Sequence, residues 1–225
     1  MEDKKSNVAY NRIYNRYLKR ILDVIASGVM LLLVWPLYVV IGVLIVMEDG
    51  FPIFYRAERG GYKNTTFKIC KFRTMIRNAD KIGGGTTALN DSRITKVGNF
   101  LRKTKLDETP QLIQVFLGKM SFVGPRPELL KYVNQYEGNE KDILQVRPGI
   151  TDYSSIKFIS LDEIVGGENA DEMYEKYVLK QKNELRMEYA RTVSFKTDIQ
   201  IFIITICKVV QKAYRFIQKK TSKGK

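Results

Sequence analysis

The sequence predicts an α+β fold in which helices dominate, and three observations support this prediction. The stretch from Ile21 to Met47 carries a single charge, Asp23, and is long enough to enter a lipid bilayer. Residues 65–75 alternate and are rich in aromatic and β-branched side chains, as β-strands are. Much of the remaining chain repeats its apolar residues at helical spacing. We therefore expect a re-entrant N-terminal membrane helix hairpin, a small antiparallel β-hairpin and interfacial amphipathic helices.

Pro36 lies in the middle of the apolar stretch and predicts how that stretch enters the bilayer. Proline removes a backbone donor and clashes with the preceding turn, so we expect the helix to break there. The N-terminal flank is basic up to Arg20, the C-terminal flank leads into a basic region, and basic residues stay on the cytoplasmic side. If both flanks lie on the same side of the membrane, residues 21–47 must form a re-entrant hairpin. A single kinked crossing is equally compatible with the hydropathy.

The chain is divided by composition into four parts. These are a basic interfacial lead-in (1–20), the membrane helix (21–47), a cytosolic domain (48–197) and a basic amphipathic C-terminal helix with its tail (198–225). In the last part, apolar residues such as Ile199 and Ile206 share a face bordered by lysines, which suits an interfacial membrane helix. A helix that packs on the core is the alternative.

Within the cytosolic domain, residues 53–58 and 65–75 predict the β-hairpin, and little regular sheet is expected beyond them. Helices are predicted over 93–104, 107–117, 128–137 and 171–191.

The 225-residue chain has a formal net charge of +14, which indicates an anionic partner. The apolar N-terminal segment favours a lipid surface or a phosphorylated substrate, and no nucleic-acid partner is expected because no recognition-helix or RNA-platform motif is present. There is no histidine, so histidine triads, histidine metal ligands and a histidine general base are excluded. The cysteines Cys70 and Cys207 lie far apart in apolar contexts and indicate buried, reduced thiols.

Asp107 and Glu108 form the first candidate site. Pro110 follows closely and is tolerated in the first turn of a helix, which predicts both carboxylates at a helix N-terminus. An ionised carboxylate there can act as a nucleophile, and its neighbour can hold Mg²⁺. Helix capping without catalysis is the simpler alternative.

Several cations are candidates for binding phosphate. Lys71 and Arg73 are expected on one face of a strand, and two prolines hold Arg126 on stiff backbone. Arg147 likewise stands beside a proline, in Arg147-Pro148-Gly149. Such positioned cations suit phosphate recognition, whereas a solvated strand face and surface arginines in turns are the alternatives.

Together these motifs resemble the bacterial sugar transferases, the monotopic phosphoglycosyl transferases that start glycoconjugate assembly on polyprenol phosphate. The resemblance covers residues 16–205 and is to the short form, which has only the catalytic core. Besides the proline-broken hairpin, the matching segments are Lys19-Arg20-x-x-Asp23, Lys71-Phe-Arg-Thr-Met75, Arg93-Ile-Thr-Lys-Val-Gly98, Leu101-Arg-Lys-Thr-Lys-Leu-Asp-Glu-Thr-Pro-Gln-Leu112, Gly118-Lys-Met-Ser-Phe-Val-Gly-Pro-Arg-Pro127 and Arg147-Pro-Gly-Ile-Thr151.

The resemblance implies a two-step exchange at the bacterial inner membrane, with the catalytic domain facing the cytoplasm. Asp107 would attack the β-phosphorus of a UDP-sugar and expel UMP, and polyprenol phosphate would then accept the sugar phosphate. Glu108 would bind Mg²⁺. The same matching implies phosphate and nucleotide contacts for Lys71, Arg73, Arg126 and Arg147, and a membrane-hairpin role for Arg20, Asp23 and Pro36.

The match has departures. Trp35-Pro36 stands where the family often has Ser-Pro, which keeps the kink but loses a hydroxyl, and Asp152-Tyr153 follows Thr151 where many members have glycine. The donor sugar is therefore not named. The alternative function is a non-catalytic membrane-bound scaffold of a polysaccharide assembly complex. The oligomeric state stays open, with a homodimer as one option.

Overall fold

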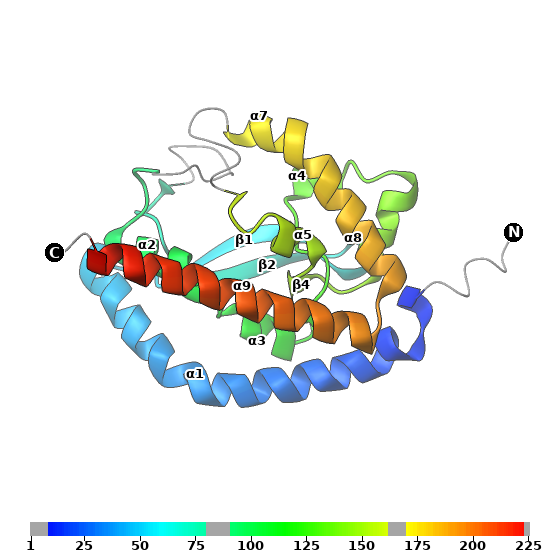
Figure 1. The fold of residues 1–225 in the computed structure, drawn as a ribbon, viewed down its shortest axis with the longest axis horizontal. Helices are drawn as coiled ribbons and strands as arrows, with labels where there is room; N and C mark the ends of the chain where they lie inside the picture. Colours follow the sequence, from blue (N-terminus) through cyan, green and yellow to red (C-terminus); the bar gives the residue numbers. More distant parts are fainter. Residues whose placement is uncertain (1–8, 80–90, 162–169, 223–225) are drawn as a thin grey trace, which may run out of the picture.

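The computed structural model describes residues 9–79, 91–161 and 170–222. Helices dominate, and they surround two small sheets (Figure 1). Residues 1–8 of the predicted lead-in and 223–225 of the predicted tail lie outside the described residues.

The predicted N-terminal apolar helix forms but is not broken. A 3₁₀ turn (Ala9–Asn11) and a π-helical turn (Tyr14–Leu18) lead into α1 (Lys19–Asp49), which continues through Pro36. Figure 1 shows α1 curving around one edge of the molecule. A proline removes one donor and pushes one carbonyl aside, so a helix whose other hydrogen bonds survive bends without ending. The helix does not end at Pro36 but curves along its length, so the predicted break is wrong.

Most of the apolar surface of α1 is exposed. Among the described residues, Tyr14–Asp49 is the one helical stretch long and apolar enough to cross a membrane, with a mean hydropathy of 2.8 and 17% of its most apolar part buried. Leu32 and Leu33 near its middle are 75% and 73% exposed. An apolar surface of this extent suits contact with lipid.

The predicted β-hairpin is confirmed. Strands β1 (Phe54–Gly60) and β2 (Thr66–Phe72) pair antiparallel, across a 3₁₀ turn at Tyr62–Asn64. A second sheet, which the sequence does not predict, pairs β3 (Ser121–Val123) with β4 (Gly149–Thr151) in parallel. Segments of three residues are too short to show a strand period.

The helices follow the predicted order with shifted ends. Within the described residues, the later helices follow in this order: α2 (Lys96–Thr104), the 3₁₀ turn η5 (Leu106–Glu108), α3 (Gln111–Phe116), α4 (Leu130–Val133), the 3₁₀ segment η6 (Gly138–Gln145), α5 (Tyr153–Lys157), α7 (Ala170–Tyr174), the π-helical turn η7 (Glu175–Leu179), α8 (Lys180–Thr192) and α9 (Phe195–Ser222). The long helix predicted over 171–191 is thus continuous from α7 to α8. The helix predicted over 128–137 is reduced to α4 and a turn.

The sequence predicts the acid pair in the first turn of an α-helix, but the structure places it outside any α-helix. Lys105 adopts a left-handed conformation with φ 61°, which ends α2, and Asp107 and Glu108 form the separate turn η5. The following helix α3 begins only after Pro110, its N-cap. The periodicity over 107–117 could not reveal this reversal because a single left-handed residue leaves no trace in an apolar pattern.

The start of α1 is anchored to the protein body. Lys19 forms a buried ion pair with Asp198 of α9. Arg20 donates hydrogen bonds to the carbonyls of Val115 (2.6 Å) and Phe116 (2.8 Å) at the end of α3. One turn further, Asp23 accepts a hydrogen bond from the Phe122 N–H.

The other end of α1 is anchored to the same body. Glu48 accepts hydrogen bonds from the backbone N–H groups of Lys96 (2.7 Å) and Val97 (2.9 Å), in the first turn of α2. Two residues past Pro36, the Tyr38 hydroxyl donates to the Thr109 carbonyl at 2.6 Å. The curved helix therefore contacts the body at its start, near Pro36 and at its end.

Helix α9 packs one face on the core and exposes another. Ile201 is fully buried. The exposed stripe consists of Ile199, Ile203, Ile206, Val210 and Tyr214. The predicted amphipathic character is confirmed, and the placement of α9 at a membrane interface stays a prediction.

Candidate active site

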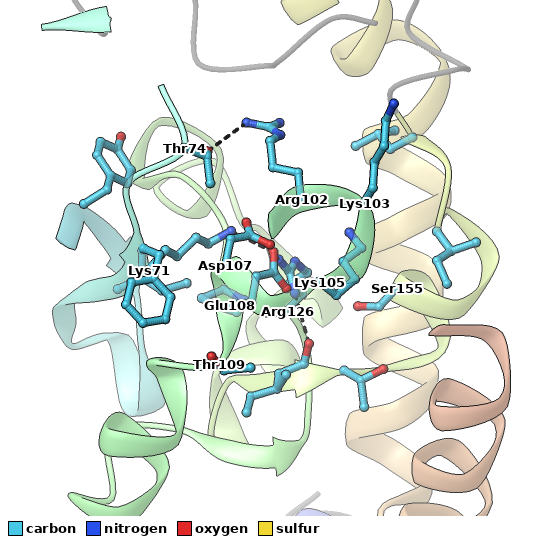
Figure 2. A pocket seen from close by; sticks show the side chains of 18 of the residues that line it. Lys71, Thr74, Arg102, Lys103, Lys105, Asp107, Glu108, Thr109, Arg126 and Ser155 are labelled. Carbon is cyan, nitrogen blue, oxygen red and sulfur yellow. Dashed lines mark hydrogen bonds and ion pairs between the residues drawn. The ribbon is translucent and has the colours of Figure 1, made fainter. Parts of the chain in front are cut away.

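A cavity of about 1890 Å³ collects the candidate residues (Figure 2). Its walls come from β2, α2, η5, the loop at 126–129, α5, α8 and α9. The cavity is lined by four of the predicted site residues: Asp107, Glu108, Lys71 and Arg126. Figure 2 shows their side chains close together.

Glu108 is held by two cations. Its Oε1 atom lies 2.8 Å from Lys71 Nζ and also accepts a hydrogen bond from Arg126. Burial alone would raise the pKa of Glu108, but the charges of Arg126, Lys71 and Lys105 outweigh burial and hold it well below the usual range. Glu108 is therefore ionised at neutral pH.

Asp107 has a different environment although it is the adjacent residue. It is 8% exposed, and its Oδ1 atom has no hydrogen-bond partner among the described residues. Burial and the negative charge of Glu108 raise the pKa of Asp107, against the opposing charges of Lys71 and Lys105. A buried carboxylate oxygen that lines a cavity without a partner is available to react or to bind a ligand.

The arginine between two prolines is fixed at several points. The Arg126 side chain donates to the Ile150 carbonyl at 3.0 Å, and its backbone N–H donates to Asp152 at 3.1 Å. Asp152 in turn caps α5 by accepting from the Ser155 N–H at 2.6 Å. The stiff backbone predicted around Arg126 is thus supported by contacts that aim the guanidinium at Glu108.

Two glycines explain why the loops around Arg126 and Arg147 approach each other. The Gly124 N–H donates to the Thr151 carbonyl at 2.9 Å, beside the β3–β4 pair. A Cβ atom on Gly124 would lie 2.3 Å from the Arg147 carbonyl oxygen, and one on Gly149 would lie 2.1 Å from the Gly124 nitrogen. Only glycine allows this close approach, so the position of Arg126 depends on Gly124 in its own loop and on Gly149 in the loop of Arg147.

Comparison with known proteins decides the family. Residues 14–212 match the family described as Bacterial sugar transferase. The chain belongs to the bacterial sugar transferase family.

Three relatives illustrate the range of this family. The chain is 36% identical over 198 residues to the UDP-glucose:undecaprenyl-phosphate glucose-1-phosphate transferase of Escherichia coli (strain K12), covering 86% of this chain and 40% of that protein. It is 35% identical to the UDP-N-acetylgalactosamine-undecaprenyl-phosphate N-acetylgalactosaminephosphotransferase of Aeromonas hydrophila, over 62% of this chain and 34% of the relative. It is 32% identical to the uncharacterized sugar transferase EpsL of Bacillus subtilis (strain 168), over 86% of this chain and 87% of the relative. The chain thus spans about 40% of the length of the first of these relatives and most of the third.

Lys105 is a cation of this sugar transferase site that the sequence does not single out. It lines the cavity, and its positive charge opposes the rise in the pKa of Asp107 and helps to lower the pKa of Glu108. Its position two residues before Asp107 is the one sequence feature that could have indicated a role in the site. That signal is weak because the inward direction of the side chain depends on the left-handed backbone.

Arg73 lies just past the end of β2 at Phe72, so it follows the strand that was predicted to carry it. Its guanidinium donates to the Gly50 carbonyl and lies 3.2 Å from Asp49, at the end of α1. Arg73 still lines the cavity, and its Nη1 atom is buried without a partner among the described residues. Its predicted phosphate contact stays a prediction, beside a role in joining α1 to the cavity wall.

Arg147 is not among the residues that line the cavity. Its Nε atom donates to the Gly118 carbonyl at 3.2 Å, and its guanidinium lies 5.0 Å from the centre of the Tyr62 ring. These contacts hold a turn, so the position of Arg147 does not favour its predicted contact with the donor phosphates.

The site suits a magnesium ion held largely by substrate. Within residues 9–79, 91–161 and 170–222, no group of three or more His, Cys, Asp and Glu side chains lies close enough to hold a metal. Mg²⁺ commonly takes one or two protein carboxylates together with substrate phosphates and waters. Both contacts to Glu108 use Oε1, which leaves its Oε2 atom for this role. Magnesium binding by Glu108 therefore stays a prediction that the site can accommodate.

Proposed function

We propose that the protein transfers a sugar 1-phosphate from a UDP-sugar to polyprenol phosphate and releases UMP. The contrast between the two adjacent carboxylates carries the proposal: Asp107 has a free buried oxygen, whereas Lys71 and Arg126 hold Glu108. The names of the relatives supply the substrate classes, a UDP-sugar and undecaprenyl phosphate.

The first step forms a covalent enzyme intermediate. An ionised oxygen of Asp107 attacks the β-phosphorus of the UDP-sugar and forms a P–O bond. The bond from the β-phosphorus to the oxygen bridging the two phosphates breaks, and UMP leaves with the electron pair. The enzyme then carries a sugar-phosphoryl group on Asp107.

The second step regenerates the enzyme. A phosphate oxygen of polyprenol phosphate attacks the same phosphorus, the bond to Asp107 breaks, and a polyprenyl-diphospho-sugar is released. Both nucleophiles are anions, so the exchange needs little proton transfer and is compatible with a chain that lacks histidine.

The cations of the site reduce the repulsion between these anions. Lys71, Arg126 and Lys105 surround the acid pair, and they would hold the diphosphate and the charge that develops as UMP leaves. Glu108 would be the protein ligand of Mg²⁺, which when bound offsets the negative charge of the diphosphate.

The reaction would take place at the cytoplasmic face of the inner membrane. The exposed apolar surfaces of α1 and α9 provide contact with lipid. A straight crossing would carry one end of α1 to the far side of the bilayer, yet both ends bind the same body through Lys19 and Glu48. This anchoring favours a helix that enters and leaves on one side.

The experiment is an assay of UMP release from a panel of UDP-sugars with Mg²⁺, with and without polyprenol phosphate. For the wild type we expect release from at least one UDP-sugar. Asp107→Asn keeps the shape of the side chain but removes the nucleophilic charge, so its rate should fall by about 10³-fold or more. Glu137→Gln, which changes an exposed acid outside the cavity, is the matched control and should keep full activity.

The same assay distinguishes the proposed transferase from the alternative, a non-catalytic scaffold. A non-catalytic scaffold releases no UMP from any UDP-sugar, with Asp107 serving only in the turn. Release by Asp107→Asn at the wild-type rate would contradict the covalent mechanism while leaving an enzyme.

A further inference from the structure

Part of the cavity lining, contributed by the segment that follows Arg126 and by α8, is not used by the phosphoryl exchange, and we call this part the side arm. The residues that line this side arm are Glu128, Tyr132, Phe158, Tyr174, Lys182 and Arg186. Glu128 follows Pro127, so the stiff loop that carries Arg126 leads directly into the side arm.

Glu128 is already paired. Its carboxylate accepts from Arg186 at 2.9 Å and from the Tyr174 hydroxyl. Burial alone would raise the pKa of Glu128, but Arg186 and the Tyr174 hydrogen bond outweigh it and lower the pKa. Glu128, the one carboxylate among these lining residues, is thus ion-paired with Arg186, and Arg186 is 1% exposed.

Lys182 has no such partner. It lies one helical turn before Arg186 on α8 and is 7% exposed. Its Nζ atom is 3.5 Å from the Tyr174 hydroxyl oxygen, 4.8 Å from the centre of the Tyr174 ring and 5.9 Å from that of Phe158. Among the described residues, no carboxylate lies within ion-pair distance of it.

The side arm therefore holds more buried hydrogen-bond donors than acceptors. A buried ammonium without a counter-ion is costly, and burial together with the charge of Arg186 lowers the pKa of Lys182 to about 7. The Arg186 Nε atom is also buried without a partner in the described part of the chain. A ligand rich in acceptor oxygens would satisfy these donors.

The aromatic side chains narrow the class of ligand. A sugar ring presents C–H faces that pack against aromatic rings and hydroxyl oxygens that accept from buried donors, and the side arm offers both kinds of group. Relatives named for UDP-glucose and for UDP-N-acetylgalactosamine share the UDP part and differ in the sugar. The family motifs recognised in the sequence end at Thr151, so they do not include Lys182.

We propose that this side arm binds the sugar of the UDP-sugar donor, with Lys182 donating a hydrogen bond to a sugar oxygen and Tyr174 and Phe158 packing against the sugar ring. The inference rests on the proposed function and adds to it the part of the cavity that selects the donor.

The test compares Lys182→Met with Lys180→Met, an exposed lysine on the same helix. KM and kcat for UMP release are measured with a UDP-sugar that the wild type accepts, together with inhibition by UMP, which lacks the sugar. Lys182→Met should raise KM at least about tenfold, as expected for loss of a buried hydrogen bond to substrate, and leave UMP inhibition within about twofold. Lys180→Met should behave like the wild type.

Folding of the variants is followed by thermal melting. Lys182→Met should melt no lower than the wild type because it removes a buried charge that has no counter-ion. Lys182→Gln, which keeps a donor on a shorter side chain, should give an intermediate KM and keeps the test valid if the methionine variant does not fold.

Two results would overturn the inference. An unchanged KM in both Lys182 variants would show that the side arm does not bind the donor, and an equal weakening of UMP inhibition would place the uridine there instead. A wild type that releases no UMP from any UDP-sugar is a separate result, because it contradicts the proposed function itself.

Discussion

At the scale of single residues, two adjacent carboxylates differ because their neighbours differ. Glu108 faces Lys71 and Arg126 and stays ionised, whereas Asp107 is buried beside that negative charge. A nucleophile and a fixed anion can thus come from one dipeptide, and the division depends on contacts rather than on residue type.

The raised pKa of Asp107 predicts how the first step depends on pH. Attack requires the ionised carboxylate, so the rate of UMP release should fall as the pH is lowered through a pKa above the ordinary value for aspartate. Glu108, whose pKa is lowered, stays ionised over the same range. The check is a rapid-quench measurement of the first turnover between about pH 4 and 8. A rate that rises as the pH falls would contradict this assignment.

The same shift predicts a gain in stability for an inactive variant. A carboxyl group whose pKa is raised on folding stabilises the protein below its unfolded-state pKa, and that contribution is lost as the pH rises through the folded-state pKa. The amide of Asp107→Asn does not ionise, so at pH 7 the free energy of unfolding of this variant should exceed that of the wild type. Thermal melting at pH 7 and at about pH 4 checks this, because the difference should shrink at the lower pH. A variant that melts below the wild type at pH 7 would be the opposite result.

The sequence predicts only part of the site at this scale. Motif resemblance predicts Asp107, Glu108, Lys71 and Arg126, and the structure brings these four together. Arg147 lies elsewhere because its side chain packs on the Tyr62 ring, a contact that its own loop sequence does not reveal.

Two further lysines of the cavity were not predicted at all. The charge of Lys105 reaches the acid pair only because its backbone is left-handed, and Lys182 reaches the cavity only because α8 packs against the loop that carries Glu128. The pattern of neighbouring residues in the sequence reveals neither the left-handed backbone of Lys105 nor the packing of α8.

At the scale of elements, the apolar helix α1 is connected by hydrogen bonds to the turn that carries the acid pair. Tyr38, two residues past Pro36 in α1, binds the carbonyl of Thr109, the residue after the acid pair. Glu48, at the end of α1, binds the first turn of α2, which leads through Lys105 to Asp107. The apolar length of α1 and its proline could be predicted from the sequence, but these contacts could not.

Glu48→Ala tests this coupling. The variant leaves two N–H groups of α2 without their acceptor, so the free energy of unfolding should fall by about 1 kcal/mol, the usual size of a lost helix cap. Because α2 positions the acid pair, UMP release should fall severalfold at the same time. Glu188→Ala, at an exposed position on α8, is the matched control and should change neither quantity. A loss of stability without any loss of activity would show that the two elements are not coupled.

At the scale of the whole molecule, the N-terminal and C-terminal helices meet in one buried network. Asp198 of α9 accepts from Lys19, from the Tyr14 hydroxyl at 2.6 Å and from the Tyr189 hydroxyl at 2.7 Å. With Glu48 holding the other end of α1, this network closes the membrane helix onto the body that contains the active site. Contacts across 179 residues of sequence are outside the reach of any periodicity argument.

Closure of α1 onto one body predicts its topology. The native cysteines must first be replaced by serine, because Cys70 is half-buried and Cys207 is exposed, whereas the sequence predicts that both are buried. In that chain, single cysteines at Arg12 and at Asn139 should both be protected in intact cells from a thiol reagent that does not cross the membrane. Both positions are exposed in the folded protein, so both should react after lysis, which is the control. Labelling of the Arg12 position alone in intact cells would establish a full crossing instead.

The most direct measurement is the mass of the protein after incubation with an accepted UDP-sugar and no polyprenol phosphate. The account predicts a mass increase equal to one sugar-phosphoryl group, located on Asp107, absent from Asp107→Asn and lost when the acceptor is added. A wild-type enzyme that turns over normally with acceptor, yet carries no such group or carries it on another residue, would contradict the account.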